Sequence, residues 1–105
     1  MIRAALIVIL AAGLAVATTG DAATPPSVQI KQFAFIPGTL TVPAGTTVTW
    51  ANADDETHTV TAADKAYTST GLEHNGTYSH RFTTPGTYTY FCMLHPHMTA
   101  TVVVQ

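Results

Sequence analysis

The sequence predicts an all-β domain that folds as a β-sandwich. Beyond its N-terminal segment the chain is rich in Thr, Val, Tyr and Phe, and Gly or Pro interrupts these runs at intervals. No stretch of that region repeats its apolar residues with the helical period of about 3.6 residues. Short strands separated by a turn roughly every eight to twelve residues are typical of sandwiches and barrels.

The N-terminal segment differs from the rest of the chain in composition. Arg3 is followed by an apolar run over residues 4–17 and then by small residues, which is the pattern of a secretory signal peptide. The run is shorter than the ~20 residues of a membrane-spanning helix, so we expect export without stable membrane insertion. We expect a signal peptide over residues 1–22, a domain over residues 23–105, and a periplasmic or secreted location. The alternative cleavage positions follow Ala17 and Ala23.

The predicted strands begin soon after this segment. Residues 28–31 alternate between apolar and polar side chains, as expected of a strand with one buried face. Ile-Pro-Gly at residues 36–38 predicts a turn, and a second short strand follows over residues 40–42. Pro-Ala-Gly at residues 43–45 turns the chain again. We expect such turns to form hairpins or to carry the chain from one sheet to the other.

The later predicted strands contain more aromatic residues. Residues 47–50 alternate Thr with Val and Trp, and residues 77–83 also alternate. A Pro-Gly turn at residues 85–86 precedes residues 88–92, which contain two tyrosines and a cysteine at alternate positions. These three share one face, because side chains two apart in a strand point the same way. A last strand covers residues 101–104 and completes the sandwich.

Composition excludes one class of partner and raises a question of stability. Lys and Arg number 4, Asp and Glu number 6, and the net charge of −2 argues against nucleic acid as a ligand. The single cysteine, Cys92, cannot form a disulfide within the chain. An exported domain of this size is marginally stable, so we expect close packing, oligomerisation or a tightly bound metal to support it.

Residues 92–98 concentrate the side chains that can bind a transition metal. Cys92, His95 and Met98 follow the spacing C-x-x-H-x-x-M, which allows one loop to supply a thiolate, an imidazole and a thioether. Thiolate and thioether are soft ligands, whereas zinc sites usually have more than one cysteine. One Cys, two His and one Met form the ligand set of a trigonal copper site with a weak axial thioether. The second imidazole must come from another segment, and His58 is the candidate.

Each of these residues also has an ordinary structural alternative. Cys92 could be a small buried side chain, Met98 could fill the core, and His58 could lie exposed at a strand end. Their combined spacing favours ligation for all of them. We expect His97 to be a solvent-exposed residue at the rim of the site. No metal role is expected for the remaining histidines, His74 and His80.

The candidate ligands and the segments around them resemble those of a known protein family. The chain is similar to the cupredoxins, the blue copper proteins of the plastocyanin and azurin family, and most closely to the amicyanin-like members with a short ligand loop. C-x-x-H-P-x-M after a Gly-Thr-Tyr-x-Tyr strand is a specific signature. The segments that carry the resemblance are residues 35–37, 39–50, 58–60, 71–72, 82–92 and 95–98.

The resemblance implies a Greek-key β-sandwich that holds one copper ion, which alternates between Cu(II) and Cu(I). It implies a periplasmic carrier of single electrons with His58, Cys92, His95 and Met98 as copper ligands, and electrons that cross through an exposed His95. We expect outer-sphere transfer to transient redox partners of the cytochrome or dehydrogenase type. We also expect a monomer whose residues around His95 form a weak docking surface.

The sequence departs from the family pattern at two positions. Many relatives have Asn directly after the first histidine ligand, where this chain has Thr59. In the family the backbone N–H at that position commonly bonds the cysteine sulfur, and it survives the change of side chain. We expect a weaker side-chain bridge between the loops. Relatives often have Phe or Trp at the position of His97, so we expect a more polar rim.

Two other functions remain open from the sequence. A copper carrier or sequestering protein would make use of His97 and Met93 near the site, and a metal-free binding module would retain the ligand set without using it. An enzyme is not expected, because the sequence offers no second metal cluster and no paired carboxylates in a cleft. The acidic run at residues 54–56 predicts a solvated loop, with docking of a basic redox partner as its functional alternative.

Overall fold

The computed structural model describes residues 26–105. The predicted signal peptide at residues 1–22, its cleavage positions and the first residues of the predicted domain lie outside the described residues. Between residues 26 and 105 the chain forms no helix, and so none that could cross a membrane.

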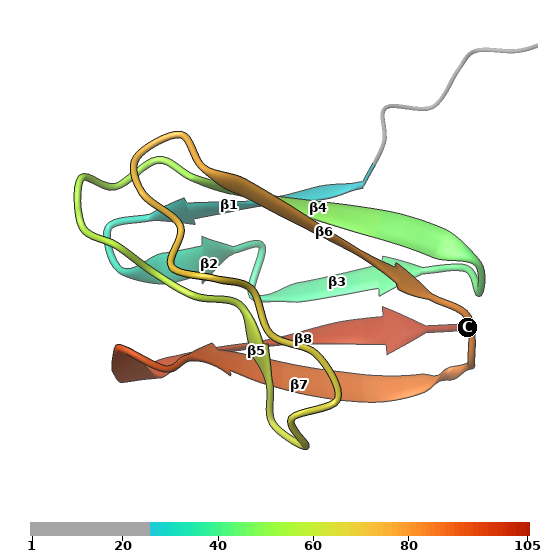
Figure 1. Cartoon of the computed structure of the whole chain (residues 1–105). Coiled ribbons are helices and arrows are strands. Elements are labelled where there is room, and N and C mark those ends of the chain that lie inside the picture. The colour runs from blue at the N-terminus through green and yellow to red at the C-terminus, as the bar shows by residue number, and fades with distance from the viewer. Residues whose placement is uncertain (1–25) are drawn as a thin grey trace, which may run out of the picture.

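The described residues form two four-stranded β-sheets that pack as a sandwich (Figure 1). The strands are β1 Ser27–Lys31, β2 Ala34–Ile36, β3 Thr39–Val42, β4 Thr46–Asn52, β5 Thr61–Ala62, β6 Thr77–Phe82, β7 Gly86–Cys92 and β8 His95–Val104. The strand order is β2-β1-β4-β6 in the first sheet and β3-β8-β7-β5 in the second. The all-β sandwich predicted from the sequence is confirmed.

The chain repeatedly changes sheet at its turns, as a Greek-key sandwich requires. It passes from the first sheet to the second between β2 and β3, at Pro37 and Gly38, and again between β6 and β7, at residues 83–85. Proline has no N–H to leave unpaired where a strand ends, which suits it to these crossings. Two strand pairings are parallel, β1 with β4 and β3 with β8, and the others are antiparallel.

The core lies between the sheets and follows the alternation of the strands. In β4, Val48 and Trp50 are fully buried while Thr47 is exposed, as the sequence pattern predicts. Trp50 packs edge-on against Tyr90 of β7 with the ring centroids 5.4 Å apart, so it connects one sheet to the other. Apolar contact across the sandwich is the main stabilising term for a domain without a disulfide.

The last strand is longer than the sequence predicts. The sequence predicts a strand over residues 101–104, but β8 begins at His95 and pairs with β7 at His95 and over residues 99–104. Cys92 pairs with His95 and Phe91 pairs with Thr99, so the register shifts there and residues 96–98 form an irregularity of β8 that has no partner in β7. Met93 and Leu94 alone lie between β7 and β8, in a tight turn.

Candidate metal centre

Three connections lie at the same end of the sandwich (Figure 1): the β1–β2 turn, the β4–β5 connection and the β7–β8 turn. His58 belongs to the β4–β5 connection, Cys92 ends β7, and His95 begins β8. Because β4 and β7 belong to different sheets, this end can surround a small ligand from both sides. The candidate ligands therefore have rigid strands behind them.

The side chains of Cys92, His58 and His95 converge at this end. Cys92 Sγ lies 3.5 Å from His95 Nδ1 and 3.7 Å from His58 Nδ1, and the two Nδ1 atoms are 3.2 Å apart. The potential ligand atoms of the three residues all lie within 4.8 Å of one another. His58 and Cys92 are fully buried, whereas His95 is partly exposed. Three donors at this spacing can bind a single metal ion, with one ligand at the surface.

His58 is held by paired backbone groups outside the named strands. Its N–H donates to the Leu72 carbonyl at 3.1 Å, and the Leu72 N–H donates to the His58 carbonyl at 2.7 Å. Asn52, which is fully buried, braces the preceding segment, because its Nδ2 donates to the carbonyls of Glu56 and Leu72, both at 2.8 Å. Its Oδ1 accepts the Asp54 N–H at 2.9 Å. The backbone around the histidine is thus fixed by the protein itself.

Asp54 orients the His58 ring, a role that sequence reasoning missed. Its Oδ2 lies 2.9 Å from His58 Nε2, and its side chain is 11% exposed. Burial alone would raise the pKa of Asp54, but the N–H groups of Phe33 and Gln32 and the His58 ring together hold that pKa below its usual value. The ionised carboxylate accepts a hydrogen bond from the Nε2–H of His58. The proton of the neutral ring is then on Nε2, so the lone pair of Nδ1 is free to bind a metal. The predicted solvated loop over residues 54–56 is therefore wrong for Asp54.

The same carboxylate fixes a turn that covers the cluster. Asp54 Oδ1 accepts the Gln32 N–H at 2.7 Å, and Oδ2 accepts the Phe33 N–H at 2.9 Å. Gln32 and Phe33 have φ angles of 54° and 58°, a left-handed conformation that side chains other than glycine rarely adopt. The Phe33 ring packs edge-on against His58 and His95, with centroids 5.0 and 4.9 Å away. No sequence signal for this contact exists, because Asp54 lies more than 20 positions along the chain.

Thr59 makes two contacts with the end of β7. Its N–H donates to Cys92 Sγ at 3.3 Å, as the family resemblance predicts. Its Oγ1 accepts the Met93 N–H at 2.9 Å, so the threonine side chain also bridges the two segments. The thiolate is the form of a cysteine that binds a metal, and the Thr59 N–H is placed to donate to its sulfur.

The remaining candidates differ in how far they are exposed. Met98 is 6% exposed in β8 and belongs to the buried cluster that contains Cys92. His97 is exposed, as expected for a residue at the rim. His74 is a surface residue with its side chain 52% exposed, and His80 is half-buried in β6.

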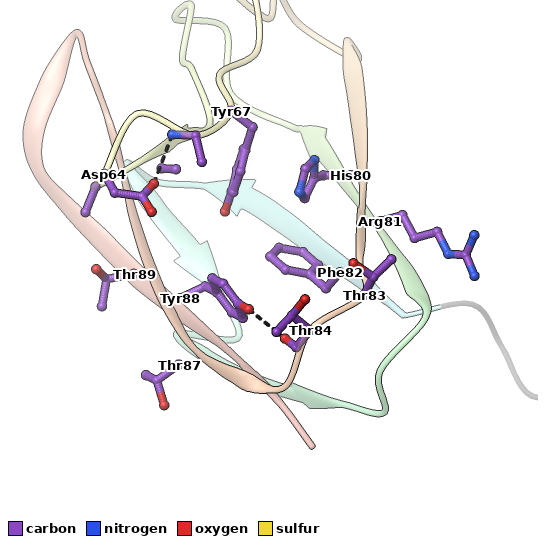
Figure 2. A pocket seen from close by; sticks show the side chains of 13 residues that line it. Asp64, Tyr67, His80, Arg81, Phe82, Thr83, Thr84, Thr87, Tyr88 and Thr89 are labelled. Carbon is purple, nitrogen blue, oxygen red and sulfur yellow. Dashed lines mark hydrogen bonds between the residues drawn. The ribbon is translucent and has the colours of Figure 1, made fainter.

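A cavity of about 360 Å³ is formed elsewhere on the protein (Figure 2). Side chains from β6, from β7 and from the segment after β5 line it, among them Tyr67, His80, Phe82 and Tyr88. The His80 ring stacks on Tyr67 with the centroids 4.1 Å apart. None of the four predicted metal ligands lines this cavity, so it is separate from the candidate metal centre.

The donor set at the centre fits copper better than zinc. Imidazole binds several transition metals, and soft thiolate and thioether donors favour copper, zinc and iron–sulfur clusters. Structural zinc sites use four strong ligands, usually with more than one cysteine, and this chain has one. A cysteine, two histidines and a methionine form the ligand set of type 1 copper centres.

Comparison with known proteins assigns this fold and donor set to one class. Residues 4–104 match the cupredoxin-like domain family. The chain is 36% identical over 101 residues to amicyanin-alpha of Methylorubrum extorquens, and the match covers 91% of this chain and 85% of that protein. The chain therefore belongs to the cupredoxin-like family. Within that family it is amicyanin-like.

Other relatives agree in fold and differ in the share of their length that matches. Amicyanin of Paracoccus denitrificans is 34% identical over 83 residues, which span 74% of this chain and 63% of that protein. The structure of an oxidised amicyanin variant superposes with a TM-score of 0.75 at 31% identity, covering 81% of this chain and 86% of that chain. A copper-containing nitrite reductase from Thermus scotoductus gives a TM-score of 0.73 at 30% identity, over 88% of this chain and 25% of that chain.

Proposed function

We propose that this protein is a periplasmic type 1 (blue) copper protein that carries single electrons between redox partners. The observation that carries the proposal is the convergence of Cys92 Sγ with the imidazole nitrogens of His58 and His95 within 4.8 Å. Met98, buried in β8 three positions after His95, would supply the thioether as a fourth ligand. Similarity to amicyanins supports the same function. One bound copper ion would supply the Cu(II)/Cu(I) couple.

The protein contributes ligands that are fixed in advance. Asp54 orients the His58 ring, and the Thr59 N–H is directed at the Cys92 sulfur. Pairing of β7 with β8 places His95 opposite Cys92. Side chains held in this way rearrange little when the charge at the centre changes by one electron. A small rearrangement is the structural requirement for a fast electron carrier.

His95 is the proposed ligand that reaches the surface. It is partly exposed, and Phe33, Met93 and Leu94 at the same end are 44, 53 and 55% exposed. A cluster of exposed apolar side chains is typical of a docking site, and electron-transfer partners bury small interfaces. We propose that a monomer passes electrons through His95 to transient partners of the cytochrome or dehydrogenase type.

The number of possible metal-binding groups and the length of the chain favour a carrier over an enzyme. Among residues 26–105, His58, Cys92 and His95 form the single group of three or more His, Cys, Asp or Glu side chains that could hold a metal. The nitrite reductase with a similar domain has a much longer chain, of which the match covers 25%. Export through the predicted signal peptide at residues 1–22 would place the carrier in the periplasm.

Exposed residues beside the ligand turn favour a second candidate function, the delivery or sequestration of copper. His97 and Met93 are both exposed and offer an imidazole and a thioether to an ion in transit. This function predicts rapid loss of copper to a chelator and slow electron self-exchange. The electron carrier predicts the opposite result in both measurements.

The visible spectrum of the purified mature protein after addition of Cu(II) tests the main proposal. We expect an intense blue colour from the Cys92 thiolate–copper bond and its loss in Cys92→Ser, which lacks the thiolate. The matched control is His97→Ala, an exposed position at which the colour should persist. A pale wild-type spectrum that Cys92→Ser leaves unchanged would contradict a type 1 centre. Electron self-exchange rates then separate the carrier from a copper-delivery protein.

A further inference from the structure

Three threonine hydroxyls form a row that leads from the β7–β8 turn to the surface. Thr59 Oγ1 accepts the Met93 N–H and lies 3.0 Å from Thr61 Oγ1. Thr61 Oγ1 lies 2.8 Å from Thr68 Oγ1. Thr59 is 7% exposed and Thr61 is fully buried, whereas Thr68 is exposed. The row therefore connects the turn after Cys92 with a residue outside the centre.

The two ends of the row fix the direction of every bond within it. At one end the Met93 N–H can only donate, so Thr59 Oγ1 accepts it at 2.9 Å. At the other end the Ser69 carbonyl can only accept, and Thr68 Oγ1 donates to it at 3.2 Å. Each hydroxyl carries one proton. Consequently Thr61 donates to Thr68, and Thr59 donates to Thr61.

Because all the hydroxyls donate in the same direction along the row, they strengthen the bond from the Met93 N–H to Thr59 Oγ1. A hydroxyl that donates to a neighbour becomes a better acceptor, because each hydrogen bond polarises the next. Thr61 therefore increases the strength with which Thr59 holds the Met93 N–H. Thr59 also donates its own N–H to Cys92 Sγ, so the same residue sets both the position of the turn and a contact to the sulfur.

We propose that Thr61 and Thr68 are positioning residues for the copper centre and act on it through Thr59. They hold the Met93 amide, and with it the turn after Cys92, where the Thr59 N–H reaches the sulfur. The electronic part of this inference rests on the proposed copper function, because hydrogen bonding at the cysteine sulfur tunes the potential of a type 1 centre. The structural part, the hold on Met93, belongs to the protein without metal.

Amide hydrogen exchange of the metal-free protein measures the hold on Met93. Thr61→Val keeps the shape of the side chain and removes the hydroxyl. The bond from the Met93 N–H to Thr59 remains, so we expect this N–H to exchange about twofold faster, the effect of losing the polarisation that Thr61 provides. Thr61→Ser restores a hydroxyl and should restore slow exchange. The matched control is Thr49→Val, which breaks a hydroxyl pair with Ser79 in the other sheet and should leave Met93 unchanged.

A second variant avoids a substitution at the fully buried Thr61, which could disturb the core. Thr68→Val alters an exposed residue and should also accelerate exchange at Met93, because Thr61 loses the acceptor of its proton. Wild-type exchange at Met93 in both Thr61→Val and Thr68→Val would overturn the proposal. So would a Thr61→Ser variant that exchanges as fast as Thr61→Val.

The copper-loaded protein provides a readout that a merely structural role would not change. We expect the reduction potential and the thiolate–copper absorption band to shift in Thr61→Val and Thr68→Val, and to coincide with wild type in Thr61→Ser and Thr49→Val. An unshifted potential in folded, copper-loaded Thr61→Val would overturn the positioning role. If wild-type protein forms no blue centre, the copper function fails, while the exchange experiment still decides whether the row holds Met93.

Discussion

Asp54 joins the candidate ligand His58 to the turn that covers it. Its carboxylate accepts hydrogen bonds from the Nε2–H of His58 and from the backbone N–H groups of Gln32 and Phe33. Three donors around a side chain that is 11% exposed stabilise its charge and restrict its motion. One carboxylate therefore controls both the orientation of the ligand ring and the placement of the aromatic ring over it.

Replacement of Asp54 by Asn tests this control at the scale of the residue. Asn has nearly the same shape but one acceptor oxygen in place of two, so either the Gln32 N–H or both the Phe33 N–H and the His58 ring lose their partner. We expect copper affinity, measured by competition with a chelator, to fall about 10- to 100-fold. Asp55→Asn removes the same charge from a side chain that is 94% exposed and should leave the affinity unchanged. Equal losses in both variants would assign the effect to net charge.

Spacing along the chain is sufficient to find some of these residues and not others. Cys92, His95 and Met98 could be identified because three side chains that can bind a metal lie three residues apart in one segment. Asp54 and Phe33 could not, because their contact depends on a left-handed turn and on strands that bring distant segments together. Residues that orient a ligand are determined by tertiary contacts, which a single sequence does not display.

At the scale of elements, the centre is built on strand ends, and the connection between β4 and β5 is the least regular of its supports. That connection carries His58 and has few ladder hydrogen bonds of its own. The Asn52 amide replaces the missing ladder with bonds to Glu56, Leu72 and Asp54. A buried amide with all of these partners makes an irregular segment rigid.

Loss of the Asn52 amide should therefore destabilise the metal-free protein. Asn52→Ala leaves the Glu56 carbonyl and the Asp54 N–H without their partner, and we expect the free energy of unfolding to fall by about 2 kcal/mol. Denaturant unfolding measures this change, with exposed Gln29→Ala in β1 as the control expected to stay within about 0.5 kcal/mol of wild type. A loss no larger than that of the control would show that the connection does not depend on the amide.

Strands were predictable as elements, but their limits were not. Alternation identified β4 and β7, because one face of each is buried in the core. The start of β8 was missed, since residues 95–98 carry ligand-type side chains and a proline in place of an alternating pattern. Within this segment His95 pairs with Cys92 of β7, and a contact between two strands of this kind is not visible in the pattern of one of them.

At the scale of the whole molecule, the sandwich contains the candidate metal centre and a separate cavity. The candidate centre occupies one end, and the cavity lined by Tyr67 and His80 lies between β6 and the segment after β5 (Figure 2). The fold class followed from short strands and regular turns. The order of the strands in each sheet did not, because the choice of neighbour depends on contacts between distant strands.

His80 links the stability of the whole domain to pH. Burial lowers the pKa of His80 below its ordinary value of 6.5, so the folded state favours the neutral ring. Tyr67 stacks on that ring, Phe82 meets its edge, and Val48 lies opposite it on β4. The charged groups that line the same cavity are Asp64 and Arg81.

The sign of the pH effect follows from the lowered pKa of His80. Well above pH 6.5 the ring is neutral in both states and its contribution is complete. As the pH falls through 6.5 toward the folded-state pKa, the unfolded chain binds the proton more readily and stability is lost. We expect denaturant midpoints of the metal-free protein to fall as the pH drops below about 6.5, and to fall less in His80→Phe, which cannot be protonated. His74→Gln, at an exposed side chain, controls for removal of a histidine and should follow wild type. An identical pH dependence in wild type and His80→Phe would mean that other groups, and not this ring, set the acid limit of the fold.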